Sequence, residues 1–485
     1  MRTQVQVSIV LALCLAQCPA VRAADPPVDV GSNRQLFVDE SLIAEKRGVR
    51  LVLHAPTRRQ VAIANDHPWE KYGVSYMVTF RDGDRFRAWY RCDAQPFDQP
   101  RLTGTAYAES QDGIHWTKPK LGIIEFAGSK QNNLVWCRSD MKNMAPFKDG
   151  NPVASPEERY KAVIASMGKS GKTLLGMVSP DGIHWKLMRD EPILTEPPFD
   201  SHNIAFWDPW AGQYVAYTRG VRRDGKLGRG MASRFKKGVR WVRRATSKDF
   251  RTWTPLEPIT TGGHPIEHFY TNATVPYMRA RGLYLMFPSR FADAREPTPG
   301  WKYGKGVNDI VLLSSRDGVH FSRTFMEAFV RPGPDPLNWH ERSLYMERGI
   351  LQTGPCELSM YAMENWRGDT VHIRRLTLRP DGFVSVRAPY AGGELITRPL
   401  RFAGRSLRVN FSTSAVGSFR VEVQDLQGKP IAPFTLTACA DICGDDVDRE
   451  VRWKAGADLG RLAGTTVQLR FAMADADLYA FRFCE

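Results

Sequence analysis

The sequence has few cysteines and none of the spacings that a cysteine-dependent metal site requires. Eight cysteines occur in 485 residues, and no cysteine pair or cysteine–histidine cluster has zinc-site spacing. Basic and acidic residues form no long run of one sign, and no nucleic-acid-binding motif is present, so we expect no nucleic-acid partner. Beyond the N-terminus no 18-residue apolar run occurs, which excludes a transmembrane helix from the mature chain. The sequence indicates no metal-binding motif and no cofactor, and it leaves open a structural Ca²⁺ in the channel and the oligomeric state.

The first residues have the pattern of a signal peptide. Arg2 precedes an apolar run from Val7 to Leu15, and Val21-Arg22-Ala23 forms a small-x-small cleavage site. We expect cleavage near Ala23, which removes residues 1–23. The mature protein is then exported, to the periplasm or out of the cell.

Export affects how the charge and the cysteines are interpreted. The formal net charge is +15, and loss of Arg2 and Arg22 leaves +13. In an exported protein this excess favours a sulfated or uronic polysaccharide as partner, with an ordinary solvated basic surface as the alternative. Cys439, Cys443 and Cys484 lie near the C-terminus, and an oxidising compartment predicts one disulfide among them.

A seven-residue motif recurs at nearly constant spacing. Its copies are Ser110–Trp116, Ser179–Trp185, Ser247–Trp253 and Ser315–Phe321, with a degenerate fifth at Arg379–Phe383. The aspartates of the copies are 69, 68, 68 and 64 residues apart. Aspartate can accept hydrogen bonds from backbone amides, and glycine can adopt a positive φ, so the motif predicts a strand-ending turn. Five equivalent copies indicate a scaffold element rather than a catalytic one.

Each repeat offers about four short strands, with an aromatic-rich pair ahead of each motif. Repeats of this kind bury their faces only against one another, so we expect an all-β fold with a five-bladed β-propeller over residues 30–395. A strand near Gln35–Val38 is expected to help close the ring. Residues 396–485 lack the motif but alternate with period two, which predicts a C-terminal β-sandwich.

This layout resembles the five-bladed propeller glycosidases of glycoside hydrolase families 32, 43, 68 and 130. The propeller followed by a sandwich is most similar to family 32. The likeness covers nearly the whole mature chain, and exported propeller proteins of polysaccharide-degrading bacteria are similar too. The segments that carry the resemblance are Leu36–Glu40, Pro146–Pro152, Glu157–Lys161 and Tyr270–Ala273.

The resemblance implies a site at one mouth of the central channel, with carboxylates at the start of the innermost strands. Hydrolysis needs an acid and an opposing nucleophile or base. At these positions Asp66 or Glu70 would act as nucleophile or base. Asp200 would support the transition state, and Glu267 would be the acid, its pKa raised by aromatic neighbours. The structural alternative for each is an ordinary loop or turn carboxylate.

Further residues near the same strand ends are candidates for binding the substrate. They are His202, Asn203, Tyr270, Asn272, Arg290, Arg342 and Glu347. The imidazole of His202 has an ordinary pKa near neutrality and could instead act as acid or base. Arginines beside the channel fit a carboxylate or sulfate group on the sugar.

The leading hypothesis is an exported, exo-acting glycoside hydrolase that cleaves plant or algal polysaccharide by paired-carboxylate chemistry. A polysaccharide lyase is the first alternative, with His202 or a tyrosine as base and arginine neutralising a uronate. A phosphorylase would need a phosphate-binding site, and export argues against a supply of phosphate to the enzyme. A propeller that binds carbohydrate without cleaving it is the third alternative.

Overall fold

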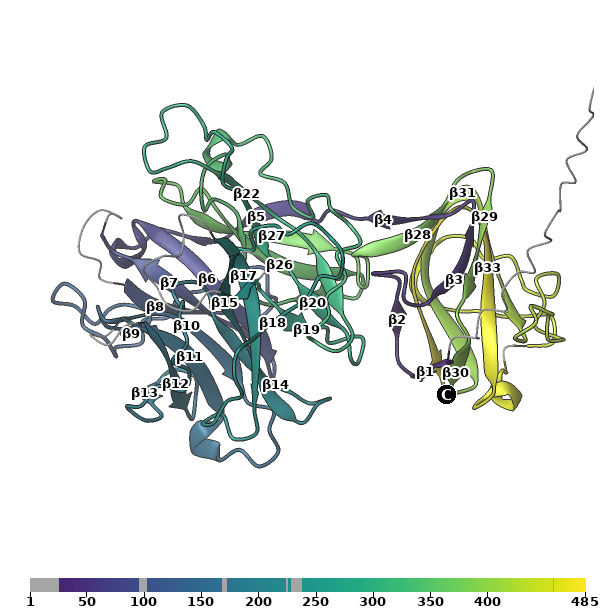
Figure 1. Cartoon of the computed structure of the whole chain (residues 1–485), viewed down its shortest axis with the longest axis horizontal. Coiled ribbons are helices and arrows are strands. Elements are labelled where there is room, and N and C mark those ends of the chain that lie inside the picture. The colour runs from purple at the N-terminus through teal and green to yellow at the C-terminus, as the bar shows by residue number, and fades with distance from the viewer. Residues whose placement is uncertain (1–25, 96–102, 168–171, 224–225, 228–237, 457) are drawn as a thin grey trace, which may run out of the picture.

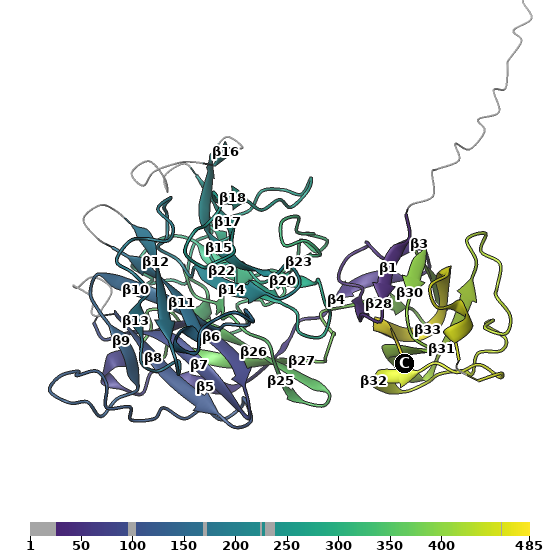
Figure 2. The same cartoon turned by 90° about the horizontal axis from the view of Figure 1, so that it is seen from below.

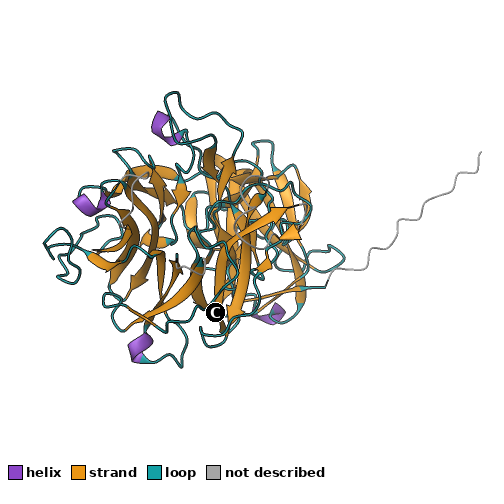
Figure 3. Cartoon of the chain, turned by 60° about the vertical axis from the view of Figure 1, so that its left-hand side comes forward, coloured by secondary structure: helices purple, strands orange, loops and turns teal. Residues whose placement is uncertain are grey.

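The computed structural model describes residues 26–95, 103–167, 172–223, 226–227, 238–456 and 458–485. The expected signal peptide lies outside these residues, and its cleavage stays a prediction. Within them the helical segments are the 3-10 turns η1 (Pro68–Glu70), η2 (Pro156–Glu158), η3 (Pro336–Asn338) and η4 (Gly460–Leu462). Strands and loops make up the rest (Figure 3), which confirms an all-β protein. No helix in these ranges is long and apolar enough to cross a membrane.

Five blades of antiparallel strands form a propeller beside a smaller C-terminal β domain (Figures 1 and 2). Blade 1 contains β6 (Gly73–Asp82), β7 (Arg85–Asp93), β8 (Thr103–Ser110) and β9 (Leu134–Cys137). Blade 2 contains β10 (Met141–Lys148), β11 (Tyr160–Ser166), β12 (Thr173–Ser179) and β13 (Lys186–Leu187). Blade 3 contains β14 (Ile204–Asp208), β15 (Gln213–Arg223), β17 (Val239–Ser247) and β18 (Glu257–Pro258), with β16 (Lys226–Leu227) paired to β15.

The last two blades are less regular. Blade 4 is split into a sheet of β19 (Val275–Pro276), β20 (Tyr284–Met286) and β23 (Leu313–Ser315), and a pair of β21 (Ser289–Ala292) and β22 (Val307–Ile310). Blade 5 contains β24 (Tyr345–Met346), β25 (Leu351–Gly354), β26 (Glu357–Glu364) and β27 (His372–Leu378). Its outermost strand is β5 (Thr57–Ala64), which comes from the N-terminal side of the propeller and closes the ring.

The expectation that Gln35–Val38 closes the ring is wrong. Gln35 and Leu36 form β2, which pairs with the last strand of the chain, β33 (Thr466–Cys484). Leu36 and Val38 instead bury their side chains against the apolar surface of blades 4 and 5. An alternating apolar segment can be covered by any neighbouring sheet, and its pattern alone does not say which.

The C-terminal domain also takes in the N-terminal strands. Its strands are β1 (Val28–Gly31), β2, β3 (Ile43–Arg47), β4 (Arg50–Leu53), β28 (Val384–Ala388), β29 (Gly393–Thr397), β30 (Leu400–Phe402), β31 (Ser406–Gln424), β32 (Asp445–Glu450) and β33. The two longest strands, β31 and β33, pair along nearly their whole length with two register shifts. The connected sheet surrounds a single apolar core that includes Phe37, Phe471 and Phe481.

The recurring motif has the scaffold role that its repetition predicts. In the first copy Ser110 Oγ lies 2.9 Å from Asp112 Oδ1, which also accepts the amides of Ile114 and His115 at 2.8 Å each. The copies at Asp181, Asp249 and Asp317 repeat this turn with the same hydrogen bonds.

The same turns also connect neighbouring blades. The carbonyl of Gly182 in blade 2 accepts a 2.8 Å hydrogen bond from Trp89 of blade 1. The carbonyl of Gly318 in blade 4 accepts one at 2.6 Å from Tyr217 of blade 3. Each glycine has a positive φ, of 78° and 73°, which L side chains rarely adopt. The motif therefore both ends a strand and fixes the adjacent blade.

The cysteines do not form the expected disulfide. All six cysteines in the described chain, including Cys439, Cys443 and Cys484, are free thiols. Cys439 is buried and its sulfur accepts the amide of Val421 at 3.3 Å, whereas Cys443 is exposed. Cys439 and Cys443 lie in the connection between β31 and β32, whereas Cys484 ends β33.

Candidate active site

Aromatic side chains from four blades stack where the innermost strands begin. The ring of Tyr345 lies 5.4 Å from that of Tyr270 and 5.8 Å from that of Tyr76, and Tyr76 stacks on His202 at 5.0 Å. Tyr76 belongs to blade 1 and His202 precedes the first strand of blade 3. These blades are not neighbours in a ring of five, so the stack crosses the propeller axis.

Three arginines surround one end of this stack. The guanidinium carbons of Arg219, Arg240 and Arg342 lie 4.3, 4.8 and 6.0 Å from the ring centre of Tyr270. Arg219 also donates a 2.7 Å hydrogen bond to the carbonyl of Tyr270. We call these three arginines, with Tyr76, His202, Tyr270 and Tyr345, the axial cluster. Its character is cationic and aromatic.

The pKa values of two contacting tyrosines in the cluster are shifted in opposite directions. Burial raises the pKa of Tyr270, but the charges of Arg342, Arg219 and Arg240 outweigh it, so the pKa lies below its ordinary value. Burial and the neighbouring phenols raise the pKa of Tyr345 well above its ordinary value. Two contacting groups whose pKa values are displaced in opposite directions are suited to opposite roles in proton transfer.

The Tyr345 hydroxyl is a buried polar group without a partner in the described part of the chain. The residue is 2% exposed, and its oxygen has no hydrogen-bond partner among the residues that the structure describes. A buried hydroxyl without a partner is costly, and a substrate oxygen or an ordered water can satisfy it.

Asp200 and His202, two of the expected site residues, both lie at the cluster. Asp200 pairs with Arg219 at 3.0 Å and with Lys172 at 3.6 Å. Burial raises its pKa, but these cations prevail and lower it to about 2, so the carboxylate stays ionised. Burial and Arg348 lower the pKa of His202 to about 3, so the imidazole is neutral at physiological pH. The expectation of an imidazole that titrates near neutrality is therefore wrong.

Two other expected binding residues lie next to cluster residues in the chain and hold the backbone there. Asn203 donates to the carbonyls of Phe199 and Ser201, and Asn272 accepts the amide and hydroxyl of Thr274. Both asparagines are buried and stabilise turns.

Glu347 has a distinct supporting role. Its carboxylate accepts the backbone amide of Met77, next to Tyr76, whose φ is +54°. Glu347 is buried at 1% exposure. It therefore positions Tyr76 in the stack, because a tyrosine in the left-handed region needs local support.

Asp66 and Glu70 share one lysine partner. Both bind Lys118, at 2.6 and 2.7 Å, and Glu70 also accepts the hydroxyl of Tyr90 at 2.6 Å. Lys118 reaches the carbonyl of Ala64 in β5, so this group joins blades 5 and 1. The two carboxylates therefore belong to an inter-blade contact, in which Lys118 compensates their charge.

We expect Glu70 to make stability depend on pH in an unusual direction. Burial raises its pKa from 4.5 to about 7, so the folded protein binds this proton more tightly than the unfolded chain. The stability that follows is complete below pH 4.5 and is lost as pH rises through 7. At about 1.4 kcal/mol per unit, the loss is about 3 kcal/mol.

The variant Glu70→Gln tests this prediction. Glutamine cannot titrate, so the variant should gain stability relative to wild type between pH 4.5 and 8. Urea unfolding at several pH values gives the difference in free energy. A difference that is constant across this range would contradict the prediction.

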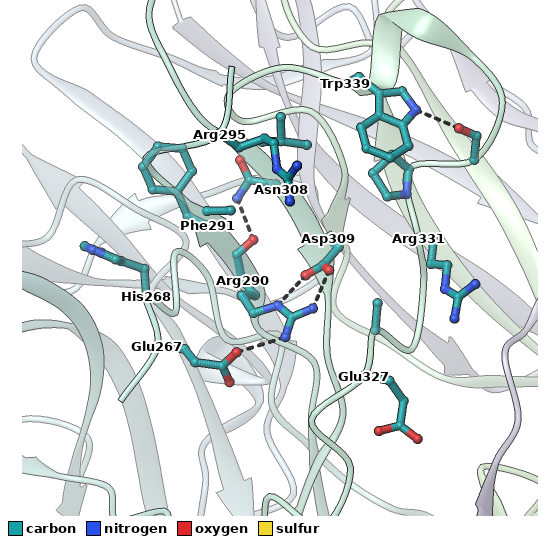
Figure 4. A pocket seen from close by; sticks show the side chains of 15 residues that line it. Glu267, His268, Arg290, Phe291, Arg295, Asn308, Asp309, Glu327, Arg331 and Trp339 are labelled. Carbon is teal, nitrogen blue, oxygen red and sulfur yellow. Dashed lines mark hydrogen bonds and ion pairs between the residues drawn. The ribbon is translucent and has the colours of Figure 1, made fainter. Parts of the chain in front are cut away.

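Glu267 and Arg290 lie together in blade 4, outside the cluster (Figure 4). Glu267 accepts Arg290 at 2.9 Å and pairs with Arg323 at 3.0 Å. Its immediate partners are thus two guanidinium groups. The sequence had suggested aromatic neighbours instead. Asp200 and Glu267 do not form a carboxylate pair in the described structure, because each is held by its own arginines.

Sequence reasoning missed Arg219, Arg240 and Tyr345. The two arginines come from β15 and β17, the second and third strands of blade 3, whereas the resemblance points to the start of each innermost strand. The sequence signal for Arg219 was its position as a charged residue between the apolar residues Tyr217 and Val221. In the described ranges no cluster of three or more His, Cys, Asp or Glu side chains could hold a metal ion.

No protein-family model matches the chain, and no curated protein matches its sequence. Solved structures are similar in fold. One described as a glycoside hydrolase is 14% identical with a TM-score of 0.46, covering 67% of this chain and 92% of that one. An N-acetylgalactosamine deacetylase from F. plautii is 13% identical with a TM-score of 0.43, covering 67% and 95%. A family 43 arabinoxylan arabinofuranohydrolase from Bacillus subtilis is 13% identical with a TM-score of 0.39, covering 87% and 98%.

Proposed function

We propose that this protein is an exported glycoside hydrolase that cleaves a polysaccharide at an acidic sugar held in the axial cluster. The observation that carries the proposal is Tyr270, a buried phenol with three guanidinium groups within 6.0 Å of its ring. Guanidinium groups bind carboxylate and sulfate through paired hydrogen bonds. A sugar whose anionic group binds these arginines therefore lies beside the hydroxyl of Tyr270.

Tyr270 is the nucleophile in this proposal. Most glycosidases use a carboxylate, but a tyrosine serves in sialidases. The Tyr270 phenolate attacks the anomeric carbon, and the bond to the leaving oxygen breaks. That oxygen takes the proton of the Tyr345 hydroxyl, which leaves Tyr345 ionised. Water then cleaves the glycosyl–tyrosine bond, and its proton returns to Tyr345.

Asp200 supports the developing positive charge on the sugar ring. It stays ionised because Arg219 and Lys172 stabilise the carboxylate. We propose exo-action because Glu347 and Arg348, which follow Tyr345 in blade 5, are buried charged side chains and leave no open surface at this point. A site closed at its base accepts a chain end more readily than a chain interior.

A polysaccharide lyase is the second candidate, and the cluster's composition favours it. Asp200 and Glu267 are held in separate ion pairs. A lyase requires no carboxylate pair. Tyr270 would take the proton from carbon 5 of a uronate whose carboxylate the arginines neutralise. The electron pair forms the carbon 4–carbon 5 double bond, and the oxygen on carbon 4 leaves with a proton from Tyr345.

The test is release of reducing ends from uronic, sulfated and neutral polysaccharides, with absorbance followed near 235 nm. We expect release from acidic substrates without a rise in absorbance. A rise would identify the unsaturated product of a lyase. Absence of release across the panel would reject both enzymes and leave a binding propeller. For export, the mass of the protein recovered outside the cytoplasm should lack residues 1–23.

A further inference from the structure

A cavity lies along strands β21 and β22 of blade 4 (Figure 4). Its volume is about 880 Å³, and its lining includes Glu267, Arg290, Asp309 and Trp339. This volume lies in the range of small-molecule sites. We call this cavity the Trp339 pocket.

Trp339 presents an exposed indole that both adjoining loops hold in place. The residue is 43% exposed. Its ring nitrogen donates to the carbonyl of Gly333 at 2.7 Å, and its carbonyl accepts the amide of Thr298 at 2.7 Å. An aromatic face fixed at the edge of a cavity suits the apolar C–H face of a sugar.

A row of three charged groups forms the polar side of the pocket. Arg290 binds Asp309 through two hydrogen bonds, of 2.8 and 2.5 Å, and Glu267 through a third of 2.9 Å. All three side chains are partly exposed. Their orientations are fixed by one another, so they offer ordered donors and acceptors to hydroxyl groups.

The charge of the pocket distinguishes it from the axial cluster. Its ionised lining consists of three carboxylates and three guanidinium groups, which balance; they are Glu267, Asp309, Glu327, Arg290, Arg295 and Arg331. The axial cluster instead gathers three arginines around one phenol. The first environment suits a neutral ligand, and the second an anionic one.

The two sites are physically connected. Phe291 lines the pocket, and its ring packs against that of Tyr270 with centres 6.0 Å apart. Asn308 also lines the pocket and accepts the amide of Arg342 at 2.7 Å. The Trp339 pocket therefore adjoins the axial cluster through these contacts.

We infer that the Trp339 pocket binds neutral sugar units of a glycan whose acidic unit enters the axial cluster. The substrate is then a mixed polymer of neutral and acidic sugars. The inference rests on the proposed function in taking a glycan as the ligand.

Affinity electrophoresis of the full-length protein tests the pocket without relying on turnover. Gels contain xylan, galactomannan or arabinogalactan as neutral probes, and polygalacturonate as the acidic one. We expect at least one neutral polysaccharide to retard the wild type. Trp339→Ala should weaken that affinity on the order of tenfold, and Trp339→Phe should retain most of it.

Tyr390→Ala is the matched control, because Tyr390 is 77% exposed and belongs to the C-terminal domain. It should migrate like wild type. Equal retardation of Trp339→Ala and wild type, or no retardation in any neutral gel, would overturn the inference. Neutral-gel retardation that depends on Trp339, in a protein that cleaves nothing, would reject the proposed function and keep the pocket. Thermal melting of each variant checks that it is folded.

Discussion

Replacing Tyr270 with phenylalanine is expected to lower kcat on an acidic saccharide by a factor on the order of 10³, with little change in KM. The substitution removes one oxygen and keeps the ring against which Arg219 and Arg240 lie. The arginines therefore still bind the anionic group. Initial rates over a range of substrate concentrations measure both constants, and a loss confined to kcat identifies a transition-state contribution.

Tyr390→Phe is the control for Tyr270→Phe. It removes the same atom from an exposed tyrosine of the C-terminal domain, and it should leave both constants unchanged. A Tyr270→Phe protein as active as wild type would reject Tyr270 as the reacting group.

The arginines provide a further readout of the same prediction. Because the charge of Arg240 lowers the pKa of Tyr270, Arg240→Gln should raise that pKa. The acid limb of the pH profile of kcat/KM should then move to higher pH. A merely structural role for Arg240 would reduce the rate without moving the limb.

Replacing Asp381 with alanine is expected to lower the free energy of unfolding by about 3–5 kcal/mol. Asp381 is fully buried. It pairs with Arg279 at 2.9 Å and Arg34 at 3.3 Å, and it accepts the hydroxyl of Tyr277 at 2.7 Å. Its loss leaves two guanidinium groups without this compensating charge. Urea unfolding compares the variant with wild type.

The position of Asp381 explains why the effect is large. Arg34 precedes β2 of the C-terminal domain, whereas Tyr277 and Arg279 belong to blade 4, so this carboxylate joins the two domains. Asp84→Ala is the control, since the Asp84 side chain is 84% exposed and its removal should change stability by no more than about 0.5 kcal/mol. Equal unfolding midpoints for both variants would contradict the prediction.

The degenerate fifth motif shows what repetition can and cannot predict. Asp112, Asp181 and Asp317 share a serine and a glycine at fixed offsets, and each forms the same local turn. Asp381 lacks the serine, and its partners come from distant parts of the chain. Local hydrogen bonds repeat with the sequence, but a contact between domains depends on which surfaces meet.

The site illustrates the same difference. Asp200, His202, Tyr270 and Arg342 were predictable because they flank the innermost strands of their blades. Asp66 and Glu70 also precede such a strand, but Lys118 draws them into the contact between blades 5 and 1. Position before a strand is a property of the sequence, whereas the direction of a side chain depends on its partners.

The sequence by itself determined the number of blades, the turns that end their strands and the all-β class, because these depend on short-range periodicity. Only the tertiary structure decided that β5 closes the ring, that the N-terminal strands join the C-terminal domain, and that three arginines converge on Tyr270. Arg219 and Arg342 are 123 positions apart in the numbering, and their convergence follows from closure of the propeller, which places strands from different blades around one axis.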